Sequence, residues 1–236
     1  MLNEKYISLI QLLKQTDING CITGSSLWCY DTDISDWDAD VDIFVYNNQA
    51  FIDAVCQVRF KLGFDFASEG ERWKWERQIK RGDTKQWLCT IKLDHPEYPQ
   101  VNISCKPNQK NVTDVISNFD QTCIMNGYDI RRKVQVDMRD MFTGDKYISM
   151  LNPLYDQDAD AYTVSNWLRQ TNRVAKYAMR GIDTTLVARA YIDMIDKVLA
   201  TGKLFQSEKS SDFFDKTTEE FVPIKEGLQQ WLDNIS

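Results

Sequence analysis

The feature that most constrains the fold is a short apolar segment that carries two aspartates, Asp40-Val41-Asp42-Ile43-Phe44-Val45. Its Val, Ile and Phe residues favour a β-strand, in which alternate side chains point to opposite faces, so Asp40 and Asp42 share one face. Two carboxylates about 5 Å apart repel by roughly 3 kcal/mol at an effective dielectric constant near 20. A bound divalent cation reverses the sign of this interaction, and Mg²⁺ prefers carboxylate oxygens together with substrate phosphates. The segment therefore predicts a metal site on a strand.

Four further aspartates precede this segment: Asp31, Asp33, Asp36 and Asp38. They do not fit an EF-hand loop, because no Gly follows at the sixth position and no Glu at the twelfth. An acidic stretch of this kind is typical of a solvated or Ca²⁺-binding loop, so we expect a loop before the strand.

A Gly-Ser turn lies upstream, in Cys21-Ile22-Thr23-Gly24-Ser25-Ser26. Glycine lets the backbone approach a phosphate, and a helical turn that starts at Ser26 would offer free N–H donors to it. Such a turn is common by itself, but it is far more specific when an apolar strand with paired aspartates follows.

Together, the Gly24-Ser25 turn and the Asp40-Val41-Asp42 motif resemble the signature of the polymerase-beta-like nucleotidyltransferase superfamily. The resemblance extends over most of residues 20–181, particularly to minimal nucleotidyltransferase-like proteins of large bacteriophages and large DNA viruses. It implies two Mg²⁺ (or Mn²⁺) ions on Asp40 and Asp42, and an NTP whose triphosphate is held by Gly24, Ser25 and Ser26.

Two-metal phosphoryl transfer usually needs a third carboxylate, which holds a metal and accepts a proton. The strand around Val101-Asn102-Ile103 is a suitable place, but Asn102 cannot act as a base. Asp120, in a Phe-Asp pair that the resemblance also matches, is the preferred candidate. Asp137 and the absence of a third acidic ligand are the alternatives.

Cations recur in a segment that resembles the C-terminal helix of the same family: Arg169, Arg173, Lys176 and Arg180. At 100° per residue they lie opposite an apolar stripe formed by Val164, Leu168, Thr171, Ala175 and Ala178. They are candidates for binding the triphosphate, Arg173 and Lys176 in particular, and a solvated helix face is the alternative.

Residues 71–87 combine six Lys or Arg with Trp73, Trp75 and Trp87. Alternation over 73–79 and 86–93 predicts a hairpin. Basic residues interleaved with aromatic ones can track a phosphate backbone and stack bases, although inward packing of one Trp-lined face explains the same pattern.

The rest of the chain predicts α/β (α+β) organisation: a small mixed β-sheet nucleotidyltransferase core, followed by a helical region. Further expected strands are 99–105, 119–125 and 132–138, the last two joined at Asn126-Gly127. Further helices are expected at 4–16, 49–61, 112–118, 162–180, 184–201 and 218–234. We therefore predict a catalytic domain over 1–150 and a C-terminal helical domain over 151–236.

Composition limits the function classes. The net charge of −7 argues against strong nucleic-acid binding through overall charge, but it leaves room for a local basic groove. One histidine and six cysteines without a CxxC pair argue against zinc, and no apolar run predicts a secretion signal or membrane span. We expect a cytoplasmic protein with reduced cysteines, in the bacterial host cytosol if a phage encodes it.

These observations predict a nucleotidyltransferase that moves a nucleoside monophosphate from an NTP to an acceptor hydroxyl. RNA, particularly a tRNA end, is the first choice of acceptor, and a protein or a small molecule is the alternative. A non-catalytic nucleotide-sensing or protein-binding module with the same fold is the other hypothesis, which Asn102 favours.

Overall fold

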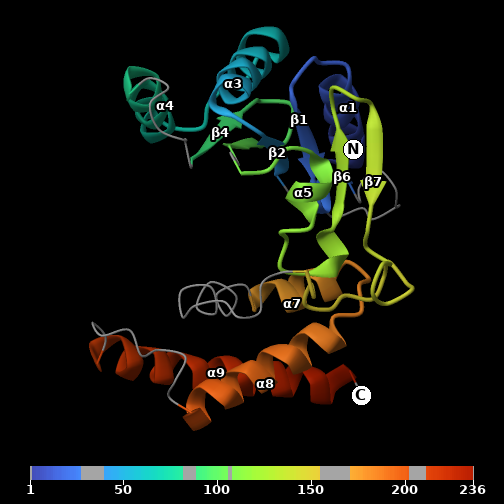
Figure 1. Cartoon of the computed structure of the whole chain (residues 1–236), viewed down its shortest axis with the longest axis vertical. Coiled ribbons are helices and arrows are strands. Elements are labelled where there is room, and N and C mark those ends of the chain that lie inside the picture. Colours follow the sequence, from blue (N-terminus) through green and yellow to red (C-terminus); the bar gives the residue numbers. More distant parts are fainter. Residues whose placement is uncertain are drawn as a thin grey trace. The chain divides into compact units, whose positions relative to one another are not determined.

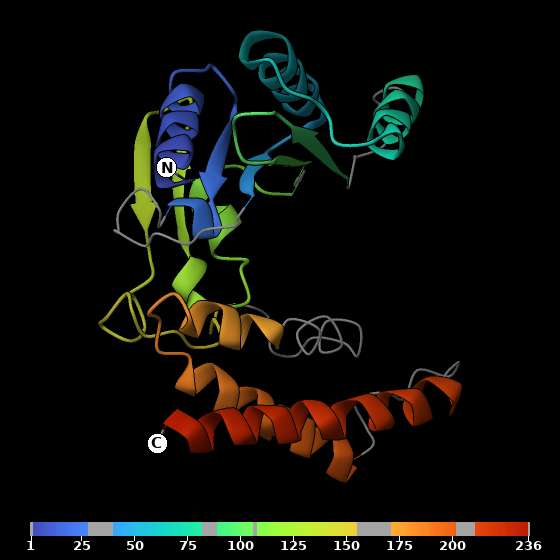
Figure 2. The same ribbon diagram turned by 180° about the vertical axis from the view of Figure 1, so that it is seen from behind.

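A computed structural model of the chain describes residues 2–27, 40–81, 89–105, 108–154, 171–201 and 211–235 (Figures 1 and 2). The chain divides into two compact units. The first comprises Met1–Asn118 with Ile124–Met138, and the second comprises Phe119–Cys123 with Arg139–Ser236.

A seven-stranded mixed sheet forms the centre of the first unit, in the order β3-β4-β5-β2-β1-β6-β7. Only β2 and β5 are parallel, and every other neighbouring pair in the sheet is antiparallel. The strands are β1 (Gly20–Thr23), β2 (Val41–Val45), β3 (Asp65–Phe66), β4 (Thr90–Asp94), β5 (Val101–Cys105), β6 (Asn126–Asp129) and β7 (Val134–Asp137).

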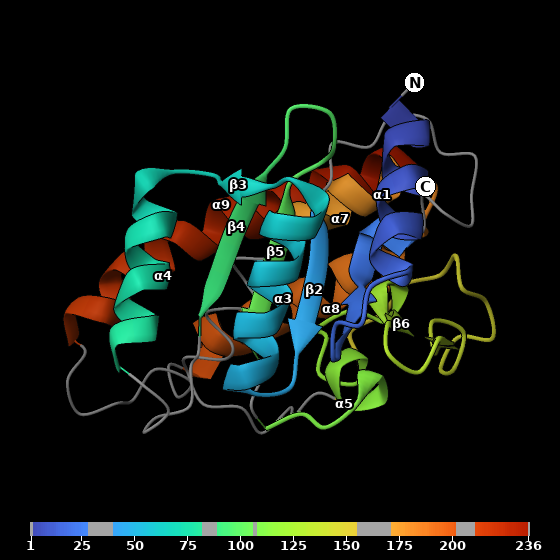
Figure 3. The same cartoon turned by 90° about the horizontal axis from the view of Figure 1, so that it is seen from above.

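Helices α1 (Leu2–Lys14) and α3 (Asn48–Leu62) lie on one side of this sheet (Figure 3). Helix α3 begins where the Asn47 side chain accepts a hydrogen bond from the Ala50 amide, and it ends at Gly63, whose φ of 79° suits glycine. Helix α3 packs on β2 and β5, and Leu9 of α1, Phe51 of α3 and Ile43 of β2 are fully buried. The mixed α/β class that the sequence predicts is confirmed.

The hairpin predicted over 73–93 is wrong, because residues Glu69–Arg81 form helix α4, and a strand is described at Thr90–Asp94. The Ser68 hydroxyl accepts a hydrogen bond from the Glu71 amide and starts the helix. Ion pairs Glu69–Arg72 and Glu71–Lys74 then join its first turns. The apparent alternation came from tryptophans two positions apart, which lie on opposite sides of a helix.

The predicted strand at 119–125 is also wrong: residues Thr122–Ile124 form a short 3₁₀ helix, η3. Asn126-Gly127 is not a turn but opens β6, and the connection to β7 runs through residues 130–133. Gly127 is needed there because helix α5 (Val112–Ile116) packs directly on it. A Cβ at this position would overlap Cγ2 of Val112.

The second unit contains α7 (Asn172–Ala178), α8 (Thr185–Thr201) and α9 (Ser211–Ile235). Helices α8 and α9 lie side by side and enclose a core that includes Tyr191, Ile195 and Leu228. On α7 the buried residues are Val174 and Tyr177, so the apolar stripe predicted through Ala175 is wrong in the described part of that helix.

The division between the units differs from the predicted boundary near residue 150. The buried Asn152 side chain donates a hydrogen bond to the Phe119 carbonyl, over 2.8 Å, and Gln121 forms a bridge with Leu151. These contacts attach residues 119–123 to the helical unit. None of the helices in the described ranges is long and apolar enough to cross a membrane.

The cysteines that the structure describes are all free: Cys21, Cys56, Cys89, Cys105 and Cys123. Burial raises the pKa of the Cys21 and Cys123 thiols to about 12, so these side chains act as small apolar groups.

Substituting Gly127→Ala should destabilise the protein by about 1–3 kcal/mol, because the new methyl group overpacks the contact with Val112 and Ile116. Gly70→Ala is the matched control. It lies in the exposed first turn of α4 with its nearest neighbour 3.5 Å away, and it should be neutral or stabilising by up to about 1 kcal/mol. Urea unfolding of both variants tests this, and equal stabilities would contradict the packing of α5 on β6.

Candidate functional site

Parallel pairing of β2 with β5 brings three polar side chains together. The register pairs Asp42 with Asn102, and Asp40 directly precedes β2. The Asn102 amide nitrogen donates hydrogen bonds to Oδ2 of Asp40 and to Oδ1 of Asp42, the second over 3.1 Å. Both carboxylates therefore lie on the face that carries Asn102.

The Gly-Ser turn lies beside this cluster because β1 runs antiparallel to β2 and pairs Thr23 with Asp42. Residues Gly24–Leu27 form a short 3₁₀ helix, η1, and Gly24 has a φ of 75°. A Cβ at Gly24 would lie 3.9 Å from Oδ2 of Asp42, so this turn closely approaches the carboxylate.

The two serines of the turn have different environments. The Ser26 side chain is buried, and its hydroxyl donates to the Thr23 carbonyl over 3.1 Å, which holds the turn closed. Ser25 is only partly buried. Of the three predicted phosphate-binding residues, Gly24 and Ser26 are thus buried, and Ser25 is the partly accessible one.

The two faces of the sheet differ in character at this point. Val41, Ile43 and Ile103 point to the face that α3 covers, and they are fully buried. Asp42 and Asn102 point to the opposite face. Lys92 of β4 pairs with Asn102 and points to that face as well. Lys92 is an exposed cation beside Asn102 that sequence reasoning missed. The alternation of polar and apolar residues over Thr90–Asp94 is the signal that could have found it.

The residues present fit a divalent cation. Oδ1 of Asn102 is buried and has no hydrogen-bond partner. A half-turn of the amide would exchange Oδ1 with Nδ2 and present an amide oxygen beside the two carboxylates, which is an all-oxygen set of the kind that Mg²⁺ prefers. Within the described ranges no three His, Cys, Asp or Glu residues cluster in this way. The aspartates of the predicted acidic loop, residues 31–38, lie outside those ranges.

Asn102→Asp should lower stability in EDTA by about 1–3 kcal/mol, because a third carboxylate replaces a donor that bonds Asp40 and Asp42. Mg²⁺ or Mn²⁺ should then raise the melting temperature of this variant more than that of the natural protein. Ser104→Asp is the control, because it adds a carboxylate to the same face of the sheet, two residues after Asn102 on β5. Equal metal responses in the two variants would contradict a cation site at Asp40 and Asp42.

Asp120, the predicted third ligand, belongs to the second unit and pairs there with Arg173 of α7. Oδ1 of Asp120 lies 3.1 Å from Nη1 of Arg173. Burial raises the pKa of Asp120 above its usual value, and the guanidinium opposes this change without cancelling it. The structure thus joins a predicted metal ligand to a predicted triphosphate-binding residue. Lys176, the other predicted cation, is exposed on the same helix.

Asp137 occupies a different environment from the other candidates. It ends the edge strand β7, where it pairs with Asn126. Asp42 of β2 pairs with Thr23 of β1, which pairs with Gly127 of β6, which pairs with Val136 of β7. Residues paired in this way point to the same face of the sheet. Asp137 is therefore on the opposite face of the sheet from Asp42, three strands away, and does not join this cluster.

Arg173→Gln should destabilise the protein by about 1–3 kcal/mol at pH 7, because it leaves the buried Asp120 carboxylate without its cation. A raised pKa in the folded state makes the ionised carboxylate unfavourable. The loss should therefore shrink as pH falls through the folded pKa towards about 3.9, the ordinary value for Asp in an unfolded chain.

Unfolding at pH 7 and pH 4.5 measures this difference. Lys225→Gln is the control, because its partner Asp196 is about half exposed, and loss of such a pair costs about 0–1 kcal/mol. If Arg173→Gln destabilises the protein equally at the two pH values, the buried ion pair between Asp120 and Arg173 is not the cause of the loss.

No protein-family model, curated protein or solved structure matches the chain. Any functional conclusion therefore depends on the geometry of the site, and membership of the nucleotidyltransferase superfamily stays a prediction.

Proposed function

We propose that this protein is a metal-dependent nucleotidyltransferase that transfers a nucleoside monophosphate from an NTP to an acceptor hydroxyl. The acceptor oxygen forms a bond to the α-phosphorus, the bond to the β-phosphate oxygen breaks, and pyrophosphate leaves. The proposal depends on one observation: Asp40 and Asp42 both accept hydrogen bonds from Asn102, and the Gly24 turn lies beside them.

The roles of the residues follow from their chemistry. Asp40 and Asp42 would hold Mg²⁺ or Mn²⁺, which supplies neutralisation of phosphate charge when bound. The backbone at Gly24 and Ser25 would hold the triphosphate next to those carboxylates. Positioning and charge neutralisation account for most of the rate in phosphoryl transfer.

Proton acceptance is assigned to Asp120 under this proposal. Its pKa is raised by burial, which is the direction a general base near neutral pH requires. Arg173, its ion-pair partner, is proposed as a phosphate-binding cation. Lys176 would add a second cation on the same helix.

A non-catalytic nucleotide-binding module is the second candidate, and one observation favours it. Asn102 stands beside Asp40 and Asp42, where a third carboxylate would complete a two-metal site, and it cannot accept a proton. Such a module would bind an NTP with a divalent cation but would release it unchanged.

Transfer can be tested with each of the four α-labelled NTPs and Mg²⁺ or Mn²⁺, against total RNA, lysate protein and small-molecule hydroxyl acceptors. We expect label to appear in an acceptor, first in RNA, and Asp42→Asn to reduce it by at least about 10²-fold. Asp53→Asn, an exposed aspartate of α3 in the same unit, should have no effect.

The melting temperature separates the two candidates. A rise with NTP and Mg²⁺ that disappears in Asp42→Asn, together with no labelled acceptor, would establish binding without transfer. Incorporation that persists in Asp42→Asn would contradict the assignment of the site itself.

A further inference from the structure

One face of α4 carries an aromatic and basic stripe that the candidate site does not use. Trp73, Glu76, Arg77 and Lys80 are spaced at i, i+3, i+4 and i+7, so they share one side of the helix, and they line one surface hollow. Trp73 is 61% exposed, which is unusual for a residue with so large an apolar surface.

The other face of α4 explains how the helix is held. Trp75 packs inward, with its ring 6.0 Å from that of Phe51 and 6.4 Å from that of Phe66. The buried Glu71 carboxylate accepts a hydrogen bond from the Lys92 amide of β4 over 3.2 Å. Trp73 is therefore left outside because the opposite side of the helix already forms the packing contact.

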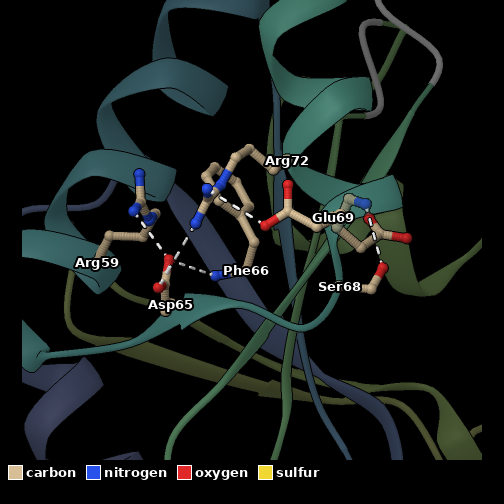
Figure 4. A network of polar contacts seen from close by, with 7 residues as sticks. Arg59, Asp65, Phe66, Ser68, Glu69 and Arg72 are labelled. Atoms are coloured by element: carbon tan, nitrogen blue, oxygen red, sulfur yellow. Dashed lines mark hydrogen bonds and ion pairs between the residues drawn. The ribbon is translucent and has the colours of Figure 1, made fainter.

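Polar contacts at the start of α4 neutralise its first cation (Figure 4). Arg72 pairs with Glu69 at 3.3 Å and lies 3.9 Å from Asp65, which also accepts a 2.9 Å hydrogen bond from Arg59. Hydrogen bonds from the Phe66 amide and from Arg59 hold the pKa of Asp65 below its usual value. This network fixes the helix on β3 and α3.

The cations of the stripe differ from those of this network. Neither Arg77 nor Lys80 forms an ion pair with a carboxylate in the described part of the chain. The Arg77 guanidinium lies 5.4 Å from the centre of the Trp73 ring. An exposed indole beside two cations is suited to a ligand that carries both flat aromatic rings and negative charge.

We propose that the Trp73, Arg77 and Lys80 stripe binds a single-stranded nucleic acid, with a base stacked on Trp73 and phosphates beside Arg77 and Lys80. Seven residues of α-helix span about 10 Å, so a strand of linked nucleotides matches the stripe better than one mononucleotide does. The acceptor role of this strand rests on the proposed nucleotidyl transfer, whereas its binding does not.

Glu76 provides a test of opposite sign. Its carboxylate lines the same hollow, where it repels phosphate and weakens the attraction by the two cations. Neutralising it should therefore tighten binding.

The experiment measures fluorescence anisotropy of labelled 12-nucleotide uridine and deoxythymidine strands in EDTA, over a series of salt concentrations. Trp73→Ala should weaken binding roughly 5- to 150-fold, the range expected for loss of one stacked base. Arg77→Gln and Lys80→Gln should each reduce the slope of log Kd against log salt by about 0.7, and Glu76→Gln should lower Kd. Tighter binding of the uridine or of the deoxythymidine oligonucleotide identifies RNA or DNA as the preferred nucleic acid.

Three controls make the outcome specific. Phe60→Ala removes another exposed ring of the same unit, and Lys5→Gln removes an exposed cation of α1; neither should change Kd by more than about twofold. Binding of a duplex should be insensitive to Trp73→Ala, because paired bases cannot stack on the indole.

Binding that Trp73→Ala leaves unchanged, or that Lys5→Gln weakens as much as Lys80→Gln does, would overturn the proposal, as would no binding by the natural protein. Because EDTA excludes metal-dependent transfer, a protein that binds the strand but never transfers label fails the proposed function alone.

Discussion

The parallel pairing of β2 with β5 is the constraint on which the rest of the first unit depends. A parallel pair needs a crossover connection, which α3, β3, α4 and β4 provide between the two strands. The register of that pair places Asp42 opposite Asn102, and the antiparallel pairing with β1 then places the Gly24 turn beside the same carboxylate. A shift by one residue in either pairing would turn the carboxylate or its partner to the buried face.

Asn102 changes the electrostatics of this arrangement. A third carboxylate in its place would face two others, whereas the amide donates to both Asp40 and Asp42 and offsets part of their repulsion. The cluster can therefore persist without a cation, at the expense of proton-accepting capacity. Asp120, the proton acceptor that we propose, is a buried carboxyl group that pairs with Arg173 within the second unit.

The sequence predicted the structure best where a segment matched the apolar spacing of a helix or of a strand, but not of both. β2, α3 with its Gly63 end, α5 and α8 were predictable from their apolar spacing and end residues. It was least informative over α4, where Trp73 and Trp75 mimic strand alternation and the deciding contacts, with Phe51 and β4, are distant in sequence. Asp42 and Gly24 could be predicted as neighbours, but the pairing of Asp120 with Arg173 could not, because side-chain partners 53 residues apart leave no local pattern.

The sheet holds two neighbouring carboxyl groups, Asp40 and Asp42, on one face, which is unfavourable without a ligand. Two ionised carboxylates about 5 Å apart repel by roughly 3 kcal/mol at an effective dielectric constant near 20, which is a large fraction of the 5–15 kcal/mol by which folded domains are stable. The buried faces of Val41, Ile43 and Ile103 and the two bonds from Asn102 stabilise the strands that bear it. Asparagine at position 40 or 42 would remove the repulsion and keep the shape. Local rules are broken in this way mainly at functional sites, so the pair of neighbouring carboxyl groups points to a ligand of opposite charge.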